Sequence, residues 1–160
     1  LDLIGLKIYQ AIFSILLLTS FAIIIYGWKS TTPLTVYDLS DWGKQLNWIL
    51  MLVALIFFMS GIHPTNLKRF IRHPMLLGVA TWAFGHLLVN GDIRSIILFG
   101  GMGAWSLLSI VTINRRDGDW LKPKKVPIKK DAITISIAII MYVVLLFAHP
   151  YLSGVKIIAI

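Results

Sequence analysis

The sequence predicts an all-α protein, a polytopic membrane bundle of about five transmembrane helices that forms a single domain. Hydrophobic residues make up 58% of the 160 residues and charged residues only 14%, whereas soluble domains are about half apolar and a quarter charged. The mean hydropathy is +0.82. Apolar runs recur along the chain, several of them close to the roughly 20 residues that cross a bilayer. A chain of this length leaves no room for an additional soluble module.

Polar and turn-forming segments separate the apolar runs. The first run ends at Tyr26 and Trp28, two aromatic residues that suit the membrane interface. The third run is slightly short for the hydrocarbon core, which tilt or burial among neighbouring helices would accommodate. The tail 151–160 is apolar but too short to cross. The predicted spans are residues 6–28, 45–62, 74–89, 93–113 and 133–148.

The central run, residues 72–92, reads RHPMLLGVATWAFGHLLVNGD and organises the chain. Pro74 suits the first turn of a helix, where its missing N–H costs nothing. Asn90-Gly91 is a turn signal and predicts the helix end. The helix between them has no acidic or basic side chain apart from the imidazole of His86. An imidazole inside such a helix is costly to bury without a partner, so His86 is a candidate functional residue.

The fourth predicted span contains several small residues. Gly100 and Ala104 are four residues apart and therefore share one face of a helix. Small residues at this spacing allow helices to approach closely in lipid. We expect Gly100 and Ala104 to face a neighbouring helix.

The basic residues predict the orientation. With five spans, eleven of the fifteen lysines and arginines fall on one side of the membrane, and the positive-inside rule makes that side cytoplasmic. Seven of them lie in the loop 114–131, which we expect to contact anionic lipid headgroups. No aromatic-interleaved basic patch is present, so nucleic-acid binding is not expected. The predicted location is the bacterial inner membrane, or an equivalent organelle membrane.

The histidines differ in predicted depth. His73 and His86 are thirteen residues apart, about 20 Å along a helix, so they cannot bind one metal ion together unless the helix breaks. By predicted depth, the histidine pairs that could share a ligand are His63 with His73, and His86 with His149. His63, His73 and His149 each precede a proline, and a capping role explains them equally simply.

The residues Trp82 and Asn90 lie four positions before and after His86, so all three share one helix face. This face would line a pocket for a planar or metal-bearing ligand. Packing and a helix cap are the alternative explanation. The other chemistry is sparse, because all seven acidic residues fall in loops or at span edges and there is no cysteine. Proton pumps and many transporters carry acidic residues inside the membrane, so the sequence disfavours these functions. The absence of cysteine excludes thiol and iron–sulfur chemistry.

The central run, followed by a glycine-rich span with Ala104-Trp105, resembles the NnrU family. The segments YQAIFSI (9–15) and HPYLSGV (149–155) fit the same pattern in the same order. The resemblance implies a small polytopic protein, associated in denitrifying bacteria with nitrite and nitric oxide reduction. A plant relative, zeta-carotene isomerase, uses a b-type haem held by two histidines. This implies haem b here, with His73 and His86 as the candidate ligands in the shared run. Where an expected ligand of the family is missing, a partner's side chain or His149 would substitute.

The family usually carries a further N-terminal span with a histidine, and the first span here looks like the second span of the family. Three alternative functions stay open. The first is a non-catalytic accessory subunit of a larger respiratory membrane complex. The second is a haem-dependent polyene isomerase. The third is a membrane methyltransferase, because 72–78 is similar to an RHPxYxG-like motif that binds S-adenosylmethionine, with Arg72 as a binding residue.

Overall fold

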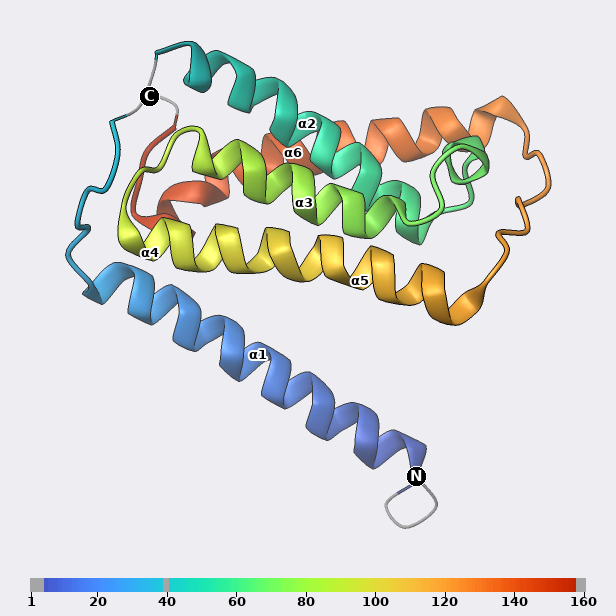
Figure 1. Ribbon diagram of the computed structural model, residues 1–160, viewed down its shortest axis with the longest axis horizontal. Coiled ribbons are helices and arrows are strands. Elements are labelled where there is room, and N and C mark those ends of the chain that lie inside the picture. The colour runs from blue at the N-terminus through green and yellow to red at the C-terminus, as the bar shows by residue number, and fades with distance from the viewer. Residues whose placement is uncertain (1–4, 39–40, 158–160) are drawn as a thin grey trace. The chain divides into compact units, whose positions relative to one another are not determined.

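The computed structural model describes residues 5–38 and 41–157, and it confirms the all-α helical membrane bundle (Figure 1). The last three residues of the predicted tail, 158–160, lie outside the described residues. The elements are α1 (Leu6–Ser30), α2 (Asp41–Ile62), the 3₁₀ helix η1 (Asn66–Arg69), α3 (Pro74–Leu87), α4 (Ile93–Ser95), the π-helical turn η2 (Ile96–Gly100), α5 (Gly101–Asp117) and α6 (Ile128–Ser153).

The chain divides into two compact units. Residues 33–146 form the larger unit, which contains α2 to α5 and most of α6. Residues 1–32 and 147–160 form the smaller unit. In the smaller unit the Lys29 ammonium donates a hydrogen bond to the Tyr151 carbonyl, which joins the end of α1 to the end of α6.

Among the described residues, four helical segments are long and apolar enough to cross a membrane: α1, α2, the continuous stretch Ile93–Asp117, and α6. The third predicted span is helical but shorter than predicted, because α3 ends at Leu87. Its 14 residues extend about 21 Å, less than the roughly 30 Å of a hydrocarbon core. Pro74 occupies the predicted first turn of α3.

The basic loop is shorter than the sequence suggested. Helix α5 continues to Asp117 and α6 begins at Ile128, so the loop is residues 118–127 rather than 114–131. The density of basic residues suggested that the loop begins at residue 114. Arg115 and Arg116 instead lie in the last turn of α5, where cations interact favourably with the helix dipole. Helix α6 also passes Pro150 and ends at Ser153.

Helix α3 packs between α2 and α5 (Figure 1). A Cβ atom on Gly78 would lie 2.8 Å from the Ala54 carbonyl oxygen and 2.9 Å from the Phe58 nitrogen, so the α2 and α3 backbones touch. On the other side, the buried Ser106 hydroxyl of α5 donates a hydrogen bond to the Leu76 carbonyl. Small side chains therefore bring three helices into close contact, as is typical of helix packing in lipid.

The expectation for Gly100 and Ala104 is wrong. A Cβ atom on Gly100 would meet nothing within 4 Å, and Ala104 is exposed. Gly103 faces α3 instead, where its Cβ would lie 3.3 Å from the Ala83 Cβ. The prediction assumed a regular α-helix, but the π-helical turn η2 inserts an extra residue and changes which side chains face the neighbouring helix.

A polar clasp joins η1 to the start of α6. The Asp131 carboxylate accepts hydrogen bonds from the Thr65 hydroxyl (2.6 Å) and the Asn66 backbone N–H (2.7 Å). The Asn66 side chain also exchanges two hydrogen bonds with the Val126 backbone. At the other end of the larger unit, the Tyr142 hydroxyl donates to the Trp48 carbonyl (3.3 Å). Both contacts join α6 or its leading loop to the segment 48–66.

Replacing Gly78 by alanine is expected to destabilise the fold. The added methyl group meets backbone atoms that cannot rotate away, and overpacking of this kind costs about 1–3 kcal/mol. Gly101→Ala is the matched control, because a Cβ atom there meets nothing within 4 Å. Thermal unfolding in detergent would show a lower midpoint for Gly78→Ala alone. Equal midpoints for both variants would contradict the close contact between α2 and α3.

Candidate functional site

His86 lies in the last turn of α3, and its ring is fixed by its own helix. The Nδ1 atom lies 2.9 Å from the carbonyl oxygen of Trp82, one turn earlier. A carbonyl only accepts hydrogen bonds, so Nδ1 carries the proton. In the neutral ring, Nε2 is then the nitrogen with the lone pair, which is the form that binds a metal.

Two aromatic rings surround His86, and we call Trp82, His86 and Phe99 the His86 cluster. The His86 and Phe99 rings stack with centroids 4.4 Å apart and an interplanar angle of 25°. The Trp82 ring lies 5.0 Å from His86 and 4.9 Å from Phe99, the latter edge-on at 71°. The sequence had predicted that Trp82 and His86 share a face of the helix. The cluster is a largely apolar setting for one imidazole.

Phe99 reaches the cluster from the π-helical turn η2. Turns of this kind are rare and often occur at functional sites. Phe99 is 5% exposed, and its ring contacts the Trp82 and His86 rings of α3. Sequence reasoning missed Phe99, because no pattern in 93–117 distinguishes a π-helical turn from a regular one.

Asn90 follows the end of α3 and acts as a cap. Its side-chain N–H group donates to the His86 carbonyl oxygen at 2.8 Å. This is the capping role that the sequence left open as an alternative to lining a pocket. The amide thus supports the backbone of His86 and not its ring.

His73 and Arg72 lie at the opposite end of α3. The His73 Nε2 atom lies 2.9 Å from the side-chain oxygen of Asn114, and the Arg72 guanidinium donates to the Gly118 carbonyl at 2.7 Å. Both residues therefore connect the start of α3 to the end of α5. Since His73 precedes the helix and His86 is in its last turn, the two imidazoles do not meet.

His149 belongs to the smaller unit. Its Nδ1 atom lies 2.9 Å from the Ser153 hydroxyl and 3.0 Å from the Val155 carbonyl oxygen. Within residues 5–38 and 41–157, no three histidine or acidic side chains come together as a metal site would require.

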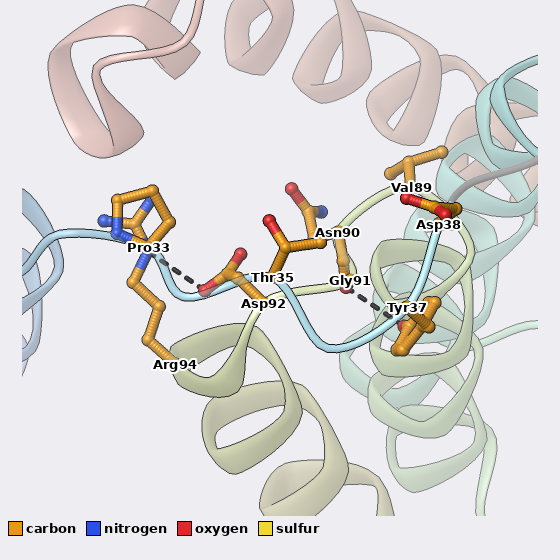
Figure 2. Close-up of a pocket in the computed structure, with 9 residues that line it drawn as sticks. All are labelled: Pro33, Thr35, Tyr37, Asp38, Val89, Asn90, Gly91, Asp92 and Arg94. Carbon is orange, nitrogen blue, oxygen red and sulfur yellow. Dashed lines mark hydrogen bonds and ion pairs between the residues drawn. The ribbon is translucent and has the colours of Figure 1, made fainter.

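Beyond the end of α3, a segment that we call the strap (residues 33–38) lies beside the turn 89–94. Together they line an open cavity of about 340 Å³, and Figure 2 shows the side chains around it. Thr35 and Asp92 form an antiparallel bridge. The Val36 N–H donates to the Gly91 carbonyl at 2.7 Å, and the Ile93 N–H donates to the Leu34 carbonyl at 3.0 Å.

Asp92 caps the start of α4. Its carboxylate accepts hydrogen bonds from the Ser95 hydroxyl (2.6 Å), the Ser95 N–H (3.2 Å) and the Arg94 guanidinium (3.1 Å). Burial raises the pKa of this carboxyl, but the Ser95 hydrogen bonds and the Arg94 charge outweigh burial and lower the pKa overall. The pKa of Tyr37 is raised by burial and then by the Asp92 charge, so its phenol stays protonated.

The comparison with family models agrees with the sequence pattern. A model described as NnrU protein matches residues 1–157. The chain belongs to the NnrU family. No curated protein and no solved structure is significantly similar to it. The family assignment covers α1 to α6, so the His86 cluster and the strap both lie within the NnrU region.

The Asp92 cap makes stability depend on acidity. Because its folded-state pKa is lowered, the stabilisation is present above the unfolded value of about 3.9 and is lost as the pH falls through the folded-state pKa. Asp92→Asn leaves a side chain that can still cap a helix but removes its charge. Hydrogen bonds to a charged group stabilise by about 1 kcal/mol more than neutral ones, so stability at pH 7 should fall by about that amount. The substitution should also weaken the loss of stability in acid.

The matched control for Asp92 is Asp41→Asn, since the Asp41 side chain is fully exposed. Thermal unfolding between pH 3 and 7 should separate the two variants. The assigned role of Asp92 would be refuted by parallel pH profiles for Asp92→Asn and the wild type.

Proposed function

We propose that this NnrU-family membrane protein binds haem b with His86 as an iron ligand and supports respiratory nitrite or nitric oxide reduction. The observation that supports this most is the state of the His86 ring. A backbone carbonyl holds Nδ1 in the protonated form, and such a hydrogen bond to the second ring nitrogen is typical of metal-binding histidines. An imidazole with Nδ1 held protonated, inside a helix without charged side chains, is a suitable iron ligand.

The residues around His86 have separate roles in this proposal. Trp82 supplies the carbonyl that orients the ring, and its indole covers one side of it. Phe99 stacks on one face of the imidazole. A bound haem would supply redox chemistry and an iron site for a small nitrogen oxide.

The accessory-subunit hypothesis is the second candidate. Gly101 has open space at its Cβ position, and Ala104 and Trp105 on the same helix are exposed. This face of α5 would accept a helix of a larger respiratory complex. Haem binding and subunit assembly are separable, because the first depends on His86 and the second on the outer face of α5.

Replacing His86 by alanine is expected to abolish the Soret band of the purified, haem-loaded protein, or to change a six-coordinate spectrum to a five-coordinate one. His63→Ala is the control and should leave the spectrum unchanged. An absorption spectrum of each variant, with a pyridine haemochrome assay, provides the measurement. A wild-type protein without a Soret band under ample haem supply would favour the accessory subunit.

We also propose that the end of the bundle bearing the 118–127 loop is cytoplasmic and contacts anionic headgroups. Both helix ends that flank this loop are basic, and the Arg72 guanidinium bonds to it. Each basic residue near an anionic surface contributes on the order of 1 kcal/mol before screening. The opposite end of the larger unit carries Lys44 and Arg94.

Cysteine labelling tests this orientation cleanly, since the chain has no cysteine. Leu121→Cys, in the basic loop and 91% exposed, should resist an impermeant maleimide added to intact cells. Leu34→Cys, in the strap and 65% exposed, should react. Replacing three lysines of the loop and one in the first turn of α6 by glutamine should raise labelling of Leu121→Cys. Strong labelling of Leu121→Cys with the lysines intact would reverse the orientation. The lysines are Lys122, Lys124, Lys125 and Lys129.

A further inference from the structure

We infer that Tyr37 is a positioning residue for the His86 cluster, and that it acts by closing the end of the helix that carries His86. Tyr37 lies in the strap, about fifty positions before the end of α3 in the sequence. Its hydroxyl donates to the carbonyl oxygens of Leu87 and Asn90, the latter at 3.0 Å.

The hydrogen bonds at the end of α3 explain why this contact matters. The last four carbonyl groups of a helix have no partner within it. In α3 the Leu88 N–H donates to the carbonyl oxygens of Phe84 and Gly85. The His86 carbonyl oxygen accepts from the Val89 N–H and from the Asn90 side chain. Among the described contacts, the last carbonyl of the helix, that of Leu87, accepts a hydrogen bond from the Tyr37 hydroxyl. A residue distant in sequence therefore completes the helix end.

The strap is fixed in place by close backbone packing. A Cβ atom on Gly91 would lie far inside contact distance of the Tyr37 carbonyl oxygen, so only glycine leaves room for the strap. The Gly91 carbonyl in turn accepts from the Val36 and Tyr37 N–H groups. These contacts fix the position of the Tyr37 phenol at the end of α3.

The strap also joins the two parts of the His86 cluster. Trp82 and His86 come from α3, whereas Phe99 comes from η2, and the turn 88–92 connects the two elements. The strap pairs with that turn through the Thr35–Asp92 bridge, and Asp92 caps the segment leading into η2. Holding the turn therefore holds Phe99 against the His86 ring.

Loss of the Tyr37 hydroxyl should loosen the last turn of α3 and release the bond between His86 Nδ1 and the Trp82 carbonyl. The ring would then sample both neutral tautomers, and only the Nδ1-protonated one presents the Nε2 lone pair to a metal. Second-shell partners of metal ligands typically contribute 10–100-fold in affinity, so we expect roughly tenfold weaker haem binding.

The test uses the full chain in lipid nanodiscs with ¹⁵N-labelled histidine. Without haem, the wild type should show His86 in the Nδ1-protonated tautomer, assigned by comparison with His86→Gln. Tyr37→Phe should show a mixture of tautomers at His86 and no change at the other three histidines. Tyr26→Phe is the matched control, because Tyr26 is 75% exposed, and it should leave every histidine unchanged. Gly91→Ala, which displaces the strap, should reproduce the effect of Tyr37→Phe.

The inference rests on the proposed function only in its haem measurement. A tautomer change in Tyr37→Phe without any haem binding would support the positioning role and refute the haem proposal. An unchanged His86 tautomer in both Tyr37→Phe and Gly91→Ala would refute the positioning role, whether or not the protein binds haem. Thermal unfolding of each variant would identify one that is misfolded. In that case Tyr37→Leu, which has no hydrogen-bond donor in its side chain, should show the same tautomer mixture in the folded fraction.

Discussion

The close approach of α2 and α3 at Gly78 determines where the rest of the larger unit can lie. The backbone atoms of Ala54 and Phe58 occupy the space that a side chain at position 78 would need, so α3 is fixed against α2. Lipid tails are as apolar as leucine, and burial of apolar surface between helices provides little driving force. Contact between backbones, small residues and a few hydrogen bonds must hold the helices instead. The hydrogen bond from Ser106 to the Leu76 carbonyl then fixes α5 on the other side of α3.

Helix α3 is short for a membrane span, and its ends are supported by side chains from other elements. At its start, Arg72 and His73 bond to Gly118 and Asn114 at the end of α5. At its end, the Tyr37 hydroxyl bonds to the last carbonyl. An unsatisfied backbone group is costly away from water, so a short helix in a bilayer needs such partners at both ends. The same support places His86 in a defined orientation beside Phe99, which is what a metal-binding imidazole requires.

Local sequence signals predicted the parts of the fold that depend on local chemistry. Pro74 marked the start of α3, and the Asn90-Gly91 turn marked the region of its end, although the last helical residue is Leu87 rather than Val89. The fold class followed from composition, and the membership in the NnrU family followed from the central run. The sequence did not predict the π-helical turn, because no pattern in 93–117 distinguishes it from a regular helical turn. Gly100 was therefore assigned to the wrong face, and Phe99 was missed. Tyr37 was missed for a similar reason, since its partners lie fifty positions away.

The central claim is that α3 and the π-helical turn bring His86 and Phe99 into ring contact. Solid-state NMR of the lipid-reconstituted protein tests this most directly, with ¹³C labels in histidine and phenylalanine. Ring centroids 4.4 Å apart predict a strong cross peak between the His86 and Phe99 rings, which is lost in Phe99→Leu. A wild-type spectrum in which His86 shows no cross peak to any phenylalanine ring would contradict the account.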